Sequence, residues 1–87
     1  RKVYVGKVLN YFKKLKVAHV LLESGKIRLK DKILIIGETT GLLEITLDKI
    51  FVKDKSSKTA QKGDEVTFVS SELVRRNDKV YLVEQSQ

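Results

Sequence analysis

The chain has 87 residues and a mass of 9.9 kDa, which is enough for one small domain with a thin core and no deep cleft. It contains no cysteine, which excludes disulfides, thiolate metal ligands and thiol nucleophiles. A formal net charge of +7 and an apolar content of 41% exclude both a disordered chain and a membrane span. We therefore expect one soluble, basic domain over residues 1–87, with the cytoplasm as its compartment.

Two further features of the composition concern the origin of the chain. The sequence begins at Arg1 and contains no methionine, from which we expect that an N-terminal segment of the native chain is missing. The absence of Cys, Met, Trp and Pro, beside abundant Lys and Ile, is compatible with a hot-living source.

The positive charge is concentrated near the start of the chain. Residues 1–36 hold ten basic and two acidic side chains, a net charge of +8, whereas residues 64–87 hold three basic and five acidic ones. Because no linker separates these parts, the asymmetry belongs to one folded unit and not to a basic tail.

Short runs rich in β-branched residues predict strands through the first half of the chain. These runs are Val3–Leu9, Val17–Glu23, Ile27–Leu29 and Ile33–Ile36. Gly6 indicates a bend or a close approach of two backbones within the first strand. Asn10–Lys16 breaks the pattern as a loop, Lys30-Asp31 is a turn, and the last strand is expected to be buried on both faces.

The second half contains one ambiguous segment, Leu42–Lys53, whose apolar residues fit both helical and strand spacing. Its β-branched and aromatic content favours a strand, and the change of parity between Leu47 and Ile50 predicts a bulge near Asp48-Lys49. Asp54–Lys62 is expected to be a polar connector. Further strands are expected around Val66–Phe68 and at Val80–Val83.

Short strands, frequent turns and no convincing long helix predict an all-β domain, either a sandwich or a small barrel. We favour a small closed six-stranded Greek-key β-barrel, because closure removes the exposed edges that an open sheet of this size must protect.

Residues Gly25–Gly37 carry a resemblance to a known family. Their glycine turn, alternating apolar pair, aspartate-containing turn, apolar strand and closing glycine resemble the second domain of translational GTPases such as elongation factor Tu. Ala60–Val66 and Val74–Val80 resemble two later turns of that domain. Gly37–Thr40 resembles a Gly-x-Thr-Thr loop of small stand-alone translation elongation factor-like proteins and of the C-terminal barrels of U32-family peptidases. The resemblance implies a translation-factor-like barrel.

The departures from that family pattern limit what the resemblance implies. Lys30 and Asn77 stand where the family usually has glycine; asparagine tolerates a left-handed backbone, whereas Lys30 there carries strain or signals a different turn. The chain has no nucleotide-binding Gly-x-x-x-x-Gly-Lys loop, and the peptidase chemistry of U32 proteins lies outside this barrel. The resemblance therefore implies a fold and no nucleotide partner or activity.

The segment Asn10–Lys16 is the most informative stretch for function. Five of its side chains are candidates for contact with RNA: Tyr11, Phe12, Lys13, Lys14 and Lys16. Exposed aromatic rings can stack on unpaired bases while the lysines neutralise phosphates. The alternative is that Tyr11 and Leu15 close one end of the barrel and the lysines are simply solvated, because basic loops are common.

Other polar residues have a structural explanation. Gly37–Gly41 lacks the lysine and helix of a phosphate-binding loop, and His19 has no positioned nucleophile or acid near it in the sequence. The serine pairs Ser56-Ser57 and Ser70-Ser71 have no nucleophile motif around them. Asp64 and Asp78 each follow a turn residue, where their carboxylates accept backbone N–H groups, and the carboxylates are otherwise dispersed. The sequence predicts no catalytic residue, metal site or cofactor.

We therefore expect a stand-alone translation-factor-like binding module, and not an enzyme, that contacts RNA or the ribosome through its basic first third. The alternative is a protein–protein interaction module or accessory barrel of a larger assembly, as in U32-family peptidases. The lack of an amphipathic basic helix disfavours a membrane partner.

Overall fold

The computed structural model describes residues 1–85, which form ten β-strands and no helix. The strands are β1 (Lys2–Phe12), β2 (Val17–Leu22), β3 (Lys26–Arg28), β4 (Lys32–Gly37), β5 (Gly41–Thr46), β6 (Ile50–Val52), β7 (Lys55–Ser57), β8 (Thr59–Gln61), β9 (Glu65–Val69) and β10 (Lys79–Val83). The expected all-β fold is confirmed. In this part of the chain there is accordingly no helix long and apolar enough to cross a membrane.

Eight of the strands form one open antiparallel sheet. Its order is β5-β4-β10-β1-β2-β9-β6-β7, so β5 and β7 are its edges, and β3 pairs with β8 in a separate two-stranded sheet. The closed six-stranded barrel that we expected is therefore not found in residues 1–85. After β5, Leu47 continues the pairing of this edge strand with the turn before β4: its N–H donates to Asp31 O (2.9 Å) and its carbonyl accepts from Lys30 N (2.7 Å).

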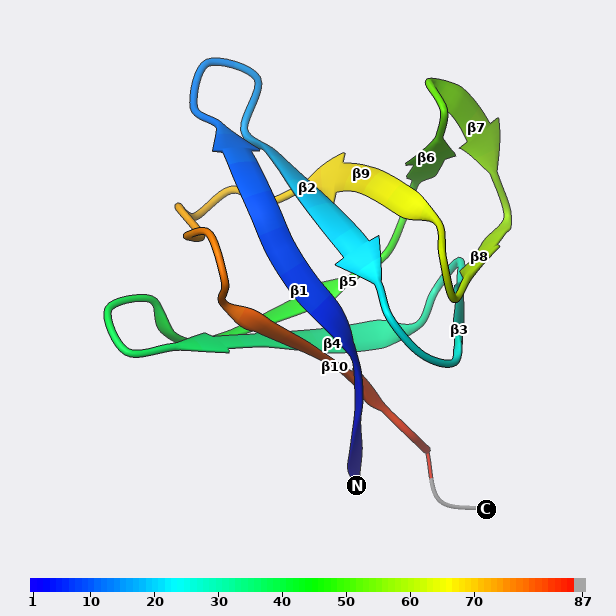
Figure 1. Ribbon diagram of the computed structural model, residues 1–87, viewed down its shortest axis with the longest axis horizontal. Helices are drawn as coiled ribbons and strands as arrows, with labels where there is room; N and C mark the ends of the chain where they lie inside the picture. Colours follow the sequence, from blue (N-terminus) through cyan, green and yellow to red (C-terminus); the bar gives the residue numbers. More distant parts are fainter. Residues whose placement is uncertain (86–87) are drawn as a thin grey trace.

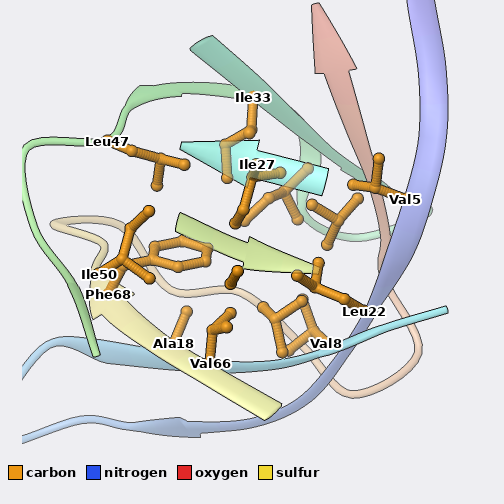
Figure 2. Packing of buried hydrophobic residues seen from close by; sticks show 14 of the residues in the cluster. Val5, Val8, Ala18, Leu22, Ile27, Ile33, Leu47, Ile50, Val66 and Phe68 are labelled. Carbon is orange, nitrogen blue, oxygen red and sulfur yellow. The ribbon is translucent and has the colours of Figure 1, made fainter. Parts of the chain in front are cut away.

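The open sheet nevertheless curls around a single core. Figure 1 shows β4, β5 and β10 crossing the direction of β1 and β2, with β3 and β8 at one side. Side chains from both halves of the sheet and from the small sheet meet in the interior (Figure 2). The buried apolar residues are Val5, Val8, Ala18, Val20, Leu22, Ile27, Ile33, Ile35, Leu47, Ile50, Ala60, Val66, Phe68, Val74 and Val80.

Gly6 marks the point where β1 bends. The register between β1 and β10 shifts between Tyr4 and Gly6, as in a β-bulge. A Cβ atom on Gly6 would lie 2.1 Å from the carbonyl oxygen of Leu21 on β2, a distance that no side chain tolerates. The close backbone approach expected at this glycine is confirmed.

Several turns depend on left-handed backbone conformations. Lys30 and Asn77 have φ of 73° and 72°, so the strain expected at Lys30 is present, and Asn77 adopts the left-handed backbone that asparagine tolerates. Lys53 and Asp54 also have positive φ, at 52° and 64°, and join β6 to β7. Two such residues in a row match the right-handed twist of a two-residue hairpin.

The structure corrects three element boundaries. The first loop begins only after Phe12, because β1 and β2 pair up to Phe12↔Val17. Leu42–Lys53 is not one bulged strand but parts of β5 and β6, which lie far apart in the sheet order. The polar segment Asp54–Lys62 is not a plain connector, since it contains β7 and β8. Pairing with neighbouring strands overrides the weak local preference of these polar residues.

We expect Gly6→Ala to lower the free energy of unfolding by about 2–3 kcal/mol or more, because the new methyl group must push β1 away from β2. Gly63→Ala is the control: Gly63 has φ of 95°, and apart from Gly63 and its two chain neighbours no atom of the described residues lies within 4 Å of the place that its Cβ would take. Backbone strain of about 1 kcal/mol is therefore the whole cost of the control substitution. Urea denaturation of both variants measures the difference. Equal losses of stability would contradict the close approach of β1 and β2.

Candidate functional site

The tip of the β1–β2 hairpin is fastened to the chain that follows β9. The Tyr11 hydroxyl donates to the carbonyl oxygen of Ser70 at 2.7 Å, and Ser70 N donates to the carbonyl of Lys16 at 2.9 Å. Tyr11 is half-buried and packs against the core. Leu15, in contrast, is 72% exposed at the turn. Tyr11 therefore closes one end of the core, whereas Leu15 points to solvent.

The remaining candidate residues are all exposed, in the turn between β1 and β2 or directly before it. Lys13, Lys14 and Lys16 are all exposed in the turn between β1 and β2. Phe12 is 42% exposed, and its ring stacks on that of His19 with a centroid separation of 6.4 Å and an angle of 26°. The structure thus gathers the three lysines at the hairpin tip but places the Phe12 ring over a histidine on the face of the sheet.

His19 belongs to a cross-strand row on β2 and β9. Its Nε2 atom lies 2.9 Å from Glu65 Oε1, and it pairs across the strands with Thr67. The hydroxyls of Ser57 and Ser70 donate to the backbone carbonyls of Thr59 and Glu72, both at 2.6 Å, so they stabilise turns. Within residues 1–85, no three His, Cys, Asp or Glu side chains gather in a way that could hold a metal ion.

A basic cluster that sequence reasoning missed lies where β1 meets β10. Lys7 and Lys79 are direct partners across these strands, although like charges placed opposite each other destabilise a sheet. Arg76 extends the cluster, since its Nε donates to the carbonyl of Leu9 at 3.2 Å. Residues 64–87 carry net negative charge, so counting charges along the chain could not find this cluster. The pairing of the last strand with the first creates it.

Asp78 connects the β4–β5 hairpin to the turn before β10. Its carboxylate is buried and accepts hydrogen bonds from the Thr40 hydroxyl and from the backbone N–H of Arg75 (2.8 Å). The Arg75 guanidinium also donates to Thr40 Oγ1 at 3.1 Å. Gly37 is required beside this group, because a Cβ there would lie 1.9 Å from Asp78 Oδ1. The Gly-x-x-Thr loop is therefore a structural contact and not a phosphate cradle.

The chain is similar in sequence to parts of two longer proteins. No protein-family model matches the chain. The chain is 37% identical over 86 residues, 99% of its length, to an uncharacterized protease of Methanocaldococcus jannaschii. It is also 37% identical over 81 residues, 93% of its length, to a collagenase of Porphyromonas gingivalis. It spans only 21% and 20% of these two relatives, so it is homologous to about a fifth of each protein.

The fold has a match among solved structures. The C-terminal domain of a Geobacillus thermoleovorans protein assigned to the U32 peptidases superposes with a TM-score of 0.85 at 18% identity, covering 93% of this chain and 92% of that domain. The selenomethionine variant of the same domain gives a TM-score of 0.83 at 19% identity. The chain therefore has the fold of a domain that forms one end of a larger protein.

Tyr4 and Glu23 form a second contact between β1 and the end of β2. The Tyr4 hydroxyl donates to the Glu23 carboxylate, and this bond, with smaller effects of burial and of nearby charge, raises the pKa of Tyr4 to about 12. Ser24 Oγ donates to the carbonyl of Tyr4 at 2.7 Å. These two bonds hold the β2–β3 connection against the first strand.

We expect Glu23→Gln to lower the pKa of Tyr4 from about 12 toward its ordinary value of 10.0, since the amide supplies no negative charge. The folded-state pKa of Tyr4 is raised, so its stabilising effect is present below pH 10 and is lost as the pH rises through about 12. Tyrosinate absorbance and denaturation between these pH values measure both effects. Glu84→Gln, at another exposed carboxylate, should leave the Tyr4 titration unchanged; a Glu23→Gln titration curve that overlays the wild type would refute the contact.

Proposed function

We propose that this chain is a β-domain of the type found at the C-terminal end of U32 peptidases, and that it acts as an accessory module and not as the catalytic part. The observation that carries this proposal is its similarity, along almost its whole length, to about a fifth of much longer proteins named as protease and collagenase. The remaining four-fifths of such a protein provide the room for a catalytic domain.

The chemistry of the chain supports an accessory role. The buried carboxylate of Asp78 accepts a hydrogen bond from Thr40 and so connects two loops within the domain. His19 is paired with Glu65 in a hollow of about 440 Å³ whose lining contains no serine or cysteine. The serine hydroxyls of residues 57 and 70 donate to backbone carbonyls. Surface charge and exposed apolar side chains are what the domain offers to other molecules, and these favour binding over bond cleavage.

A domain exchange in the Porphyromonas gingivalis collagenase tests the accessory role. Replacing its matched 81 residues with the corresponding part of this chain should preserve collagen cleavage, whereas deleting them should lower kcat/KM at least about tenfold, or about 1.4 kcal/mol. The unmodified collagenase is the reference, and size-exclusion chromatography checks that each protein is folded. Full activity of the deletion variant would show that the domain contributes nothing to the enzyme.

A second candidate function is the translation-factor-like one, in which the domain contacts RNA or the ribosome. It is favoured by the exposed cluster of Lys13, Lys14 and Lys16 at the hairpin tip, close along β1 to the Leu9 carbonyl that Arg76 binds. Tyr11 is engaged with Ser70, so Phe12 is the better placed ring for stacking on a base. Binding of this kind rests chiefly on phosphate contacts and is sensitive to salt.

RNA binding is tested by fluorescence anisotropy with a structured RNA at about 50 and about 200 mM salt. Three phosphate contacts predict a loss of affinity of about 40-fold across this range, and replacing Lys13, Lys14 and Lys16 with Glu should abolish binding. The matched control replaces Lys53, Lys55 and Lys58 with Glu, the same charge change at the β7 edge. Failure to bind at low salt, or equal losses in both triple variants, would remove this candidate.

A further inference from the structure

The two edges of the large sheet differ in how they are protected. β7 has three residues (Lys55–Ser57) and is flanked by Lys53 and Lys58, and short, lysine-rich edges resist pairing with other strands. β5 has six residues (Gly41–Thr46) without lysine or proline, and its register with β4 is continuous from Lys32↔Thr46 to Gly37↔Gly41. Glu44, which is paired with Lys32 of β4 at 3.5 Å, is the one charged residue on β5, so this edge is less protected against strand addition than β7.

The outer side of β5 has no strand beside it. Among the described residues, β5 pairs with β4 alone, and in the sheet order it is terminal. A strand paired on one side leaves alternate N–H and C=O groups directed away from its partner. Such a row of donors and acceptors at strand spacing matches the backbone of another extended chain.

Apolar side chains are partly uncovered at the β5 edge. Leu43 and Ile45 pack against the core but are only half-buried, because nothing in the described part of the chain covers them on the outer side of β5. A groove of about 350 Å³ lies between the end of β5 and β9. It is lined by four apolar residues and three polar or charged ones: Ile45, Leu47, Phe68 and Val69, with Thr46, Asp48 and Lys49. Val69 is 61% exposed. β6 pairs with β9 only at Val66 and Thr67, so this end of β9 is also uncovered on that side.

We propose that β5 is a docking edge for an extended segment of the catalytic portion of the same longer polypeptide. The segment adds to the sheet beside β5 through backbone hydrogen bonds, and its inward side chains are apolar and cover Ile45 and the groove beside Val69. This proposal rests on the accessory role described above and specifies the surface by which the domain docks.

A second copy of the chain is a poorer occupant. Six residues at about 3.4 Å each give an edge about 20 Å long, which buries on the order of a few hundred Å² per partner against the roughly 800 Å² of a stable interface. Two copies each carrying +7 also repel one another. A segment of the same polypeptide, by contrast, has a high effective concentration, which makes a short interface sufficient.

The test compares backbone hydrogen exchange in the isolated 87-residue chain with exchange in the collagenase domain-exchange protein, residue by residue over β5. The isolated chain can be used because it has its own buried core. We expect alternate amides within residues 41–46 to exchange at least about tenfold more slowly in the larger protein. Alternation is the signature of strand addition, because the intervening amides already pair with β4.

Two single substitutions test whether β5 makes the proposed contact. Leu42, 65% exposed on β5, is replaced by lysine, which should remove the added protection and lower kcat/KM toward that of the deletion variant. Leu15→Lys is the matched control, since Leu15 is 72% exposed at the distant hairpin tip and acquires the same charge. It should leave both protection and activity unchanged.

Each outcome bears on a different part of the inference. If the domain-exchange protein is active and protection appears elsewhere while β5 is unchanged, the docking edge is wrong and the accessory role stands. If deletion of the domain leaves activity intact and no residue gains protection, both fail. If β5 in the isolated chain becomes protected as its concentration rises, the occupant is a second copy and the proposed segment is refuted.

Discussion

The close approach of β1 and β2 at Gly6 is the constraint on which the rest of the structure depends. β1 pairs with β10 on one side and with β2 on the other, so it joins the two halves of the sheet. The bulge at this glycine lets the sheet bend there, and the bend brings β4 and β10 to face β2 and β9 across the core (Figures 1 and 2). A side chain at position 6 would hold the backbones apart.

The folding of the sheet on itself determines which polar groups become neighbours. It joins the Gly37–Gly41 hairpin to the turn before β10 through Asp78, and it places Lys79 opposite Lys7. It also leaves the two edges unequal, with a short basic β7 and a longer apolar β5. The core of this domain is thin, and Leu43 and Ile45 beside the uncovered strand are only half-buried. A neighbouring polypeptide that packs there gains free energy by covering this apolar surface.

Local sequence signals predicted much of the fold. Gly6, Lys30 and Asn77 were interpretable because steric limits on the backbone act within a few residues. The strands β7 and β8 were not predictable, since polar residues with weak strand preference pair only when a partner is present. The same limit applies to the candidate site: the lysines of the first loop were visible, but the basic cluster of Lys7, Arg76 and Lys79 was not.

The sequence by itself determined an all-β domain, the turns at Lys30 and Asn77 and an excess of positive charge, because these follow from residue type and short-range spacing. Tertiary structure alone decided that the sheet stays open, that Tyr11 is tied to Ser70, and that β5 is left without a second neighbour among the described strands. Strand order and closure depend on contacts between residues far apart in the chain, and their free energies come from burial that no local pattern specifies.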